Sequence, residues 1–213
     1  MLTALALLSS FIAQVKLLDP SFTFNLGIDN PVVLVGVFIG AALPFLFSAL
    51  TISSVGKSAQ RVVLEVRRQF ASDPGILTGK SHPDYARCVK ICTSSAQKQM
   101  IAPAIIAVLS PIVFGILLGA NGVAGMLLGS SVTGFLLAVF MSASGGAWDN
   151  AKKYVEDGHF GGKGTSAHKA AVIGDTVGDP FKDTSGPSIN ILIKLISVVA
   201  IVFAQVILAA GIL

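Results

Sequence analysis

Residues 122–144, GVAGMLLGSSVTGFLLAVFMSAS, contain no charged side chain over a length that can cross a lipid bilayer. Small residues recur along this segment: Gly125, Gly129, Ser130, Ser131 and Gly134. Small side chains let two membrane helices approach closely, which replaces the hydrophobic driving force that lipid removes. We therefore expect a membrane helix that packs tightly against another helix.

The composition of the whole chain agrees with a lipid environment. Of the 213 residues, 53% are hydrophobic and only 12% are charged, whereas soluble domains carry about 25% charged residues. So few charges cannot cover a water-soluble surface, which excludes an ordinary soluble globule. The net charge of +4 is interpreted as a signal of membrane topology and not of nucleic-acid binding.

Apolar segments long enough to consider as membrane helices occur along the whole chain. We expect five of them, at residues 1–15, 32–55, 100–118, 122–144 and 185–213. The first is short, because a bilayer requires about 20 residues. The second continues into an amphipathic stretch, 56–70, which predicts one long helix that projects from the membrane. The predicted fold class is an all-α polytopic membrane helix bundle, with residues 1–213 as one domain.

The basic residues are distributed unevenly among the connections. Residues 56–98 and 152–182 hold 13 of the 15 Lys and Arg residues, whereas 19–30 and 119–122 hold none. The positive-inside rule places both basic segments on the cytoplasmic side. With five crossings, the N-terminus is then inside and the C-terminus outside. The three histidines, His82, His159 and His168, are expected at the surface.

Three aspartates precede the last apolar segment. Asp175, Asp179 and Asp183 are spaced four residues apart, which predicts one helical face, with Lys182 beside them. A solvated helix end is the alternative interpretation of this charged run. A second pair, Asp149 and Lys152, lies three residues apart after the segment 122–144 and also shares a face.

Parallel carboxylates repel one another unless a cation lies between them. Carboxylate oxygens select hard cations, and magnesium usually takes one or two carboxylates together with phosphate oxygens of a substrate. Lysines among them contact phosphate oxygens as point charges. The pattern therefore predicts metal-assisted phosphoryl hydrolysis on the cytoplasmic side.

The acidic face continues into the membrane. Helical spacing from Asp183 leads through Gly186 and Asn190 to Lys194, about 16 Å deeper. A buried lysine at this depth requires a carboxylate partner and indicates charge movement coupled to hydrolysis. Snorkelling of Lys194 to an interface is the alternative.

Two long motifs carry a resemblance to a known family. Residues 145–154, GGAWDNAKKY, and 174–188, GDTVGDPFKDTSGPS, resemble the C-terminal motifs of the membrane-bound, ion-pumping pyrophosphatases. The resemblance extends over the whole chain, including 47–51, FSALT, and 65–70, EVRRQF.

The resemblance implies specific residue roles. Asp149, Asp175 and Asp179 match magnesium ligands, and Lys152 and Lys182 match contacts to pyrophosphate. Asp183 matches one of two carboxylates that orient the attacking water. Lys194 matches the lysine of the family's ion gate.

The resemblance also implies partners and an expected incompleteness. Such pumps hydrolyse magnesium pyrophosphate in the cytoplasm and move H+ or Na+ outward across the lipid bilayer, as homodimers of subunits with about sixteen helices each. Five helices are about a third of such a subunit, so we expect a C-terminal part that needs the missing N-terminal helices or a complementary chain. We hypothesise that the chain alone is inactive.

The transported ion stays open between H+ and Na+. Residues 184–194 look more like the potassium-stimulated members, for which K+ is an activator. Two other functions also stay open. One is a non-enzymatic membrane subunit whose acidic face docks a partner. The other is a secondary transporter, which is disfavoured because the charges gather at the cytoplasmic end and not at the membrane midplane.

Overall fold

The computed structural model describes residues 2–212, and every regular element among them is a helix. The elements in chain order are α1 (Leu2–Leu18), α2 (Pro31–Ser72), α3 (Tyr85–Glu156), η1 (His159–Gly161), α4 (Ser166–Asp179), η2 (Pro180–Ser185), α5 (Gly186–Val202) and α6 (Ala204–Ala210). Local sequence fixes several helix starts. At α2, the Asn30 side chain accepts a hydrogen bond from the Val32 N–H, and Pro31 occupies the first turn, where its missing N–H costs nothing.

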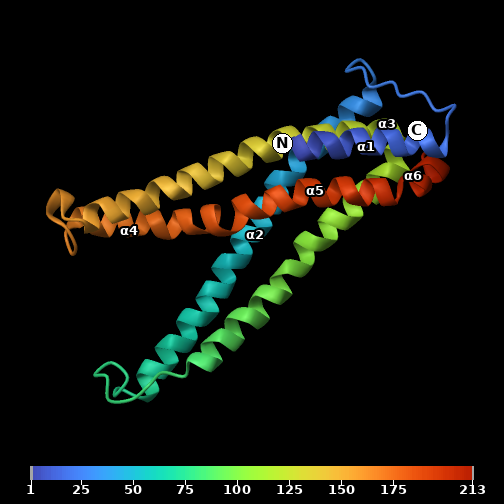
Figure 1. Cartoon of the computed structure of the whole chain (residues 1–213). Helices are drawn as coiled ribbons and strands as arrows, with labels where there is room; N and C mark the ends of the chain where they lie inside the picture. The colour runs from blue at the N-terminus through green and yellow to red at the C-terminus, as the bar shows by residue number, and fades with distance from the viewer. Residues whose placement is uncertain (1, 213) are drawn as a thin grey trace.

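The longest helix, α3, reverses direction at one glycine. Gly119 has φ 60° and ψ −171°, a conformation that disfavours residues with a Cβ. In Figure 1 the ribbon of α3 turns back sharply, so that residues 85–118 and 120–156 form two limbs. These two limbs contain the apolar segments 100–118 and 122–144 that were expected as separate helices.

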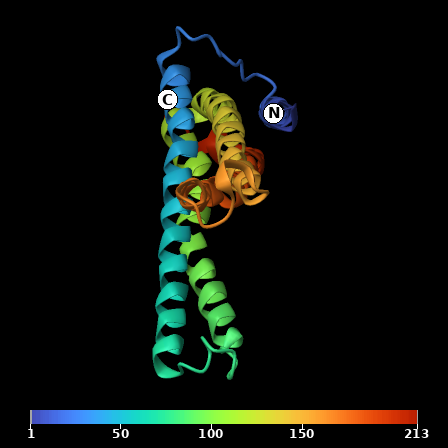
Figure 2. The same ribbon diagram turned by 90° about the vertical axis from the view of Figure 1, so that its left-hand side faces the viewer.

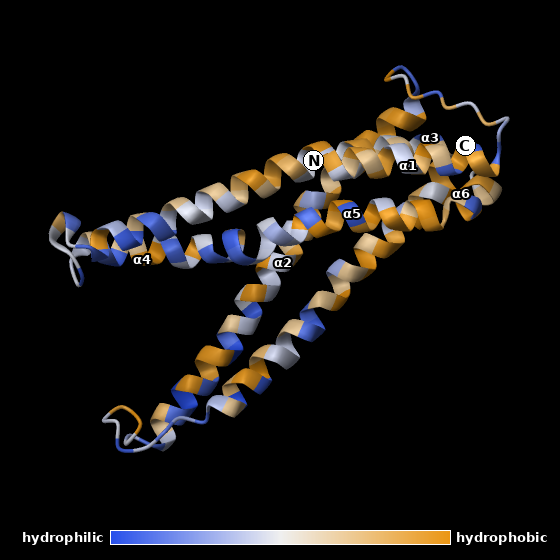
Figure 3. Cartoon of the chain, viewed as in Figure 1, coloured by the Kyte–Doolittle hydropathy of each residue, from blue (hydrophilic) through white to orange (hydrophobic). Residues whose placement is uncertain are grey.

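Three helical stretches are long and apolar enough to cross a membrane: Pro31–Ser72, Tyr85–Glu156 and Ser166–Val202. Helix α1, with 17 residues, is shorter. The prediction of an all-α membrane helix bundle is therefore confirmed. Figure 3 shows apolar residues concentrated over α1, α5 and the adjoining parts of α2 and α3, and polar residues over α4 and the two outer loops.

The apolar core lies where α1, α2, α3 and α5 meet. Its fully buried side chains include Phe11, Met126, Leu127, Ile189 and Ile196.

Glycines bring α2 and α3 into backbone contact beside this core. A Cβ on Gly125 would lie 2.4 Å from the Val33 carbonyl oxygen, and one on Gly129 would lie 2.2 Å from that of Val37. The small residues of 122–144 thus permit the close packing that their pattern predicts.

Two helical arms extend from this core. The α2–α3 arm comprises residues 56–98 with the connecting loop at its tip, and the α3–α4 arm comprises residues 145–182. Figure 1 shows both tips at the same end of the molecule, and Figure 2 shows the α2–α3 arm as a long hairpin beyond the remaining helices.

The connections without Lys or Arg gather at the opposite end. The Asn25 N–H donates to Asn121 Oδ1 at 3.0 Å, and the Ile212 N–H donates to the Ile116 carbonyl oxygen at 3.0 Å. The basic arms and these connections therefore lie at opposite ends. This arrangement supports the expected sidedness, which stays a prediction.

Candidate functional site

The predicted site residues before Lys194 lie between the second limb of α3 and the α4–η2 segment. A Cβ on Gly145 would lie 2.5 Å from the Gly178 carbonyl oxygen, and one on Gly174 would lie 2.2 Å from the ring of Trp148. These glycines let the two helices run close together, so that charged side chains from both meet. We call Asp149, Lys152, Lys153, Asp175, Asp179, Lys182 and Asp183 the Asp/Lys cluster.

Asp149 accepts hydrogen bonds from two lysines. Lys182 Nζ lies 2.8 Å and Lys153 Nζ 3.1 Å from Asp149 Oδ2. Asp149 lies outside the apolar segment 122–144, and the hydrogen bond from Lys182 followed by that from Lys153 lowers its pKa to about 2. Asp149 is therefore an anion at any physiological pH.

Asp175 is the most deeply buried acid of the cluster. Its side chain is 7% exposed and forms an ion pair with Lys152 through Oδ2. Its other oxygen, Oδ1, is buried and has no hydrogen-bond partner among residues 2–212. A buried polar atom without a partner costs free energy, so Oδ1 is a position at which a cationic or proton-donating ligand is favoured.

Asp179 and Asp183 are more open to solvent. Their side chains are 50% and 64% exposed, and Lys182 Nζ lies 3.5 Å from Asp179 Oδ1 and 3.8 Å from Asp183 Oδ2. Lys182 therefore lies within ion-pair distance of both carboxylates, whereas Asp175 pairs with Lys152.

Asp183 lies in the π-helical segment Pro180–Ser185. Pro180 has no N–H to donate, and i→i+5 bonding changes the angular step between residues. Asp183 therefore follows Asp179 with a different rotation from the one that an uninterrupted α-helix would give.

Lys194 lies outside the cluster. It lines a pocket of about 870 Å³ between α1, α3 and α5, together with Asn190 and Ser131. Lys194 is exposed on the surface of the described residues, within the membrane-spanning candidate Ser166–Val202, and its neutralisation by a carboxylate in the membrane stays a prediction. Lys194 forms no ion pair within the described part of the chain. The reason is that α5 turns its Asn190 and Lys194 side away from the core that covers Ile189 and Ile196.

Two residues that hold the α3–α4 arm together were not predicted from the sequence. Lys153 contacts Asp149, and its i, i+4 spacing from that aspartate could have revealed it. His168, expected at the surface, is only 19% exposed and its Nε2 lies 3.1 Å from Glu156 Oε1. The Gly164 N–H donates to His168 Nδ1 at 3.2 Å, so this histidine ties the loop at the tip of the arm to both helices.

The cluster provides magnesium-type donors without a complete metal site. Carboxylate oxygens are suitable ligands, and Asp175 Oδ1 is unpaired. Across residues 2–212, however, no group of three His, Cys, Asp or Glu side chains converges closely enough to hold a metal, because lysines lie between the aspartates. One or two of these carboxylates fit magnesium only if phosphate oxygens complete its coordination.

Together, the fold and the cluster define a class: a polytopic helical membrane protein with interleaved aspartates and lysines at one end of its apolar core. The model of the family described as inorganic H+ pyrophosphatase matches residues 1–203. The chain belongs to this family.

Curated relatives match nearly the whole chain. A putative K+-stimulated pyrophosphate-energized sodium pump of Clostridium tetani is 56% identical over 99% of this chain. A pump of the same description from Bacteroides thetaiotaomicron is 51% identical over 95%. A K+-insensitive pyrophosphate-energized proton pump of Methanosarcina mazei is 52% identical over 100%. The chain spans about 30% of the length of these relatives.

Proposed function

We propose that this chain contributes the C-terminal part of a pyrophosphate-energised cation pump, in which hydrolysis of inorganic pyrophosphate drives H+ or Na+ out of the cytoplasm. The observation that carries the proposal is the interleaving of Lys152 and Lys182 with Asp149 and Asp175 across two helices. Separated lysines and carboxylates suit a magnesium-neutralised polyphosphate, because they offer contacts of both signs within one short region.

The proposed roles of the lysines and the aspartates follow from their charges. Lys152 and Lys182 would contact phosphate oxygens, exchanging their present aspartate partners for the ligand. Asp149, Asp175 and Asp179 would hold magnesium, which supplies neutralisation of the charge on the phosphates and the leaving group. Asp183, the most exposed of the acids of the cluster, would accept a proton from an attacking water.

The coupling path is proposed to run below this cluster. Helix α5 continues directly from η2, so a movement of the η2 backbone on ligand binding would reach the helix that carries Asn190 and Lys194. Lys194 lines a pocket together with polar groups from α3 and α5. A cation that entered this pocket would interact electrostatically with the Lys194 ammonium. Family relatives include pumps named for sodium and pumps named for protons, and identities of 56% and 52% do not separate the two.

Calorimetric titration tests directly whether the Asp/Lys cluster binds a magnesium–pyrophosphate ligand. The chain in detergent is titrated with imidodiphosphate, a non-hydrolysable pyrophosphate analogue, with and without Mg2+. We expect imidodiphosphate to bind only when Mg2+ is also present. Binding should be at least about tenfold weaker in Lys182→Gln, because a charge-assisted contact is lost. Lys169→Gln is the matched control, because Lys169 lies on α4, is exposed and has no ion pair among the described residues. Binding that is independent of Mg2+ contradicts the proposal and favours a docking face.

A second experiment tests the need for the rest of the family's length. We expect no pyrophosphate hydrolysis by the chain alone in liposomes above an Asp183→Asn control. A chimera that joins this chain to the remaining part of the Clostridium tetani relative should hydrolyse pyrophosphate, and Asp183→Asn should abolish that activity. Hydrolysis by the 213-residue chain alone would contradict the hypothesis that this chain is active only together with the rest of the pump.

A further inference from the structure

A second charged cleft lies on the α2–α3 arm, away from the Asp/Lys cluster. It has a volume of about 690 Å³ and lies between the facing sides of α2 and the first limb of α3. Its charged lining residues are Arg61, Glu65, Arg68, Arg87 and Lys90. Four cations and one carboxylate leave a net charge of +3 around one cleft.

The single carboxylate of this cleft is buried and holds two arginines in place. Glu65 is 6% exposed, accepts hydrogen bonds from Arg68 Nε at 3.0 Å and Nη2 at 2.7 Å, and lies 3.0 Å from Arg87 Nε. Because one carboxylate neutralises one charge, the pair of guanidinium groups retains a positive charge. Their remaining N–H groups belong to side chains that are half exposed and free to donate to a ligand.

The other two cations enlarge the positive field. Arg61 Nη1 donates to Ser95 Oγ at 3.4 Å, which orients the guanidinium without neutralising it. Lys90 has no carboxylate within ion-pair distance in residues 2–212. Two arginines held by Glu65, a third oriented by a hydroxyl group and the Lys90 ammonium form a strongly anion-selective arrangement.

The chemistry favours phosphate over other anions. Planar guanidinium groups donate two parallel hydrogen bonds that match phosphate geometry, and the cleft volume falls in the range of small-molecule sites, about 300–1,000 Å³. A phosphate group of a small soluble molecule and a lipid headgroup share this chemistry.

The position of the cleft along α2 favours the soluble source. The apolar segment 32–55 ends ten residues before Glu65, which is about 15 Å along a helix axis. The headgroup layer adds only roughly 5–8 Å beyond the hydrocarbon core. Most of the cleft is therefore expected on the aqueous side of that layer.

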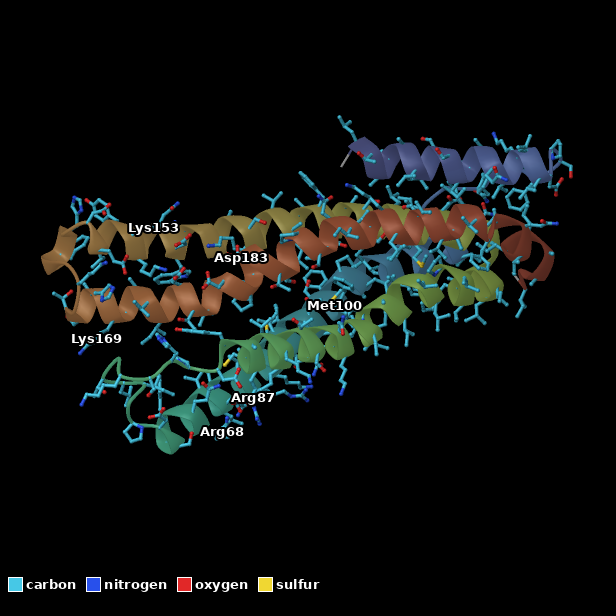
Figure 4. The ribbon with its side chains drawn as sticks, turned by 60° about the horizontal axis from the view of Figure 1, so that its bottom comes forward. Arg68, Arg87, Met100, Lys153, Lys169 and Asp183 are labelled. Atoms are coloured by element: carbon cyan, nitrogen blue, oxygen red, sulfur yellow. The ribbon has the colours of Figure 1, made fainter. Side chains whose placement is uncertain are left out.

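The cleft is separate from the Asp/Lys cluster. Figure 4 shows Arg68 and Arg87 beside each other on one arm, with Lys153 and Asp183 on the other arm. We infer that this cleft is a second anion site, which binds the phosphate group of a soluble molecule between the two helices of the α2–α3 arm.

Equilibrium dialysis with radiolabelled inorganic phosphate tests the inference on the full chain in nanodiscs of neutral phosphatidylcholine without Mg2+. The test variant is Arg61→Gln/Lys90→Gln, which leaves the pairs of Glu65 with Arg68 and Arg87 intact. The matched control is Lys57→Gln/Arg67→Gln, which removes two cations from the same arm at exposed positions outside the cleft. Thermal unfolding verifies that both variants remain folded.

We expect saturable phosphate binding that weakens at least about tenfold in the test variant, equivalent to about 1.4 kcal/mol, and at most twofold in the control. Phosphate held by the Asp/Lys cluster contributes equally to both variants, so their difference isolates the cleft. Equal affinities in the two variants, or no saturable binding by the wild type, overturn the inference. A third result also overturns the inference. If phosphate does not bind in neutral nanodiscs and only the test variant loses co-purified anionic lipid, the ligand of the cleft is a lipid headgroup.

Discussion

Asp175 and Asp183 are eight residues apart, yet their environments differ. Asp175 is buried against Lys152 and has one unpaired oxygen, whereas the Asp183 side chain is 64% exposed. Burial gives Asp175 a structural role beside its proposed binding of a ligand, because a lysine left without its buried partner is destabilising.

We predict that Asp175→Asn lowers the midpoint of thermal unfolding by several degrees, and that Asp183→Asn changes it by no more than about one degree. The reason is that only Asp175→Asn leaves Lys152 without its nearest anion. Unfolding of the purified chain in detergent, followed by circular dichroism, measures both. Equal shifts in the two variants would show that the ion pair with Lys152 carries no stability.

Glu65 provides a pH-dependent contribution to stability. Hydrogen bonds from Arg68 and then Gln69 lower the pKa of this buried carboxyl from 4.5 to about 2. A group with a depressed pKa in the folded state stabilises the fold above its unfolded pKa, and that contribution is lost as the pH falls towards the folded value. The contribution is therefore complete above pH 4.5 and disappears between pH 4.5 and 2.

We predict that the unfolding midpoint of Glu65→Gln lies below that of the wild type at pH 6, and that this gap narrows steadily from pH 4.5 to pH 2. Thermal unfolding across this pH series measures the gap. Asp149 titrates in the same range in both proteins, so its effect cancels in the difference. A gap that is constant over the whole series would contradict the role of the Glu65 charge.

At the scale of elements, two adjacent glycines on α3 serve different purposes. Gly145 packs against α4, where a Cβ would lie 2.5 Å from the Gly178 carbonyl oxygen, whereas a Cβ on Gly146 meets no atom within 4 Å. The first permits the close contact of α3 and α4 on which the Asp/Lys cluster depends. The second only adds backbone freedom to a helix.

We predict that Gly145→Ala destabilises the chain by about 1–3 kcal/mol through overpacking, and that Gly146→Ala stabilises it by about 0.5–1 kcal/mol through helix propensity. Denaturant or thermal unfolding distinguishes the two signs. Gly145→Ala should also weaken binding of imidodiphosphate with Mg2+, because Lys182 lies on the displaced segment. A stabilising Gly145→Ala would show that the α3–α4 contact is looser than described.

The π-helical segment Pro180–Ser185 shows how a local change of helix type limits a prediction made from residue spacing. The spacing of Asp175, Asp179 and Asp183 predicted one helical face, but that prediction assumed an uninterrupted α-helix. Pro180 was visible in the sequence, and its missing N–H was a signal that the helical register changes there.

At the scale of the whole molecule, the two cysteines are suited to test sidedness. Cys88 and Cys92 both lie on the α2–α3 arm, which we expect in the cytoplasm from the distribution of Lys and Arg. Asn25 lies at the opposite end, bonded to Asn121.

We predict that a membrane-impermeant maleimide labels Cys92 in inverted vesicles and not in intact cells. A Cys88→Ser/Cys92→Ser/Asn25→Cys variant should show the reverse pattern. Mass spectrometry of the purified chain quantifies both. Labelling of Cys92 from outside intact cells would invert the proposed topology and place the Asp/Lys cluster on the wrong side for cytoplasmic pyrophosphate.

The amino-acid sequence determined the apolar segments, the helical class, the uneven distribution of basic residues and the motifs that carry the family resemblance. These properties are local: they depend on the composition of each segment and on spacing along one helix. Tertiary structure decided which charges meet. It joined Asp149 to Lys182 across 33 residues, buried Asp175 while leaving Asp183 open, and left Lys194 exposed beside a pocket.

The physical reason is that a side chain's partner depends on the distance between helices and on the rotation of each helix about its axis. Gly145 and Gly178 set the distance between α3 and α4, and the π-helical turns after Asp179 set the rotation of Lys182 and Asp183. Both depend on contacts between segments far apart in the chain, and a single helical spacing contains no information about them.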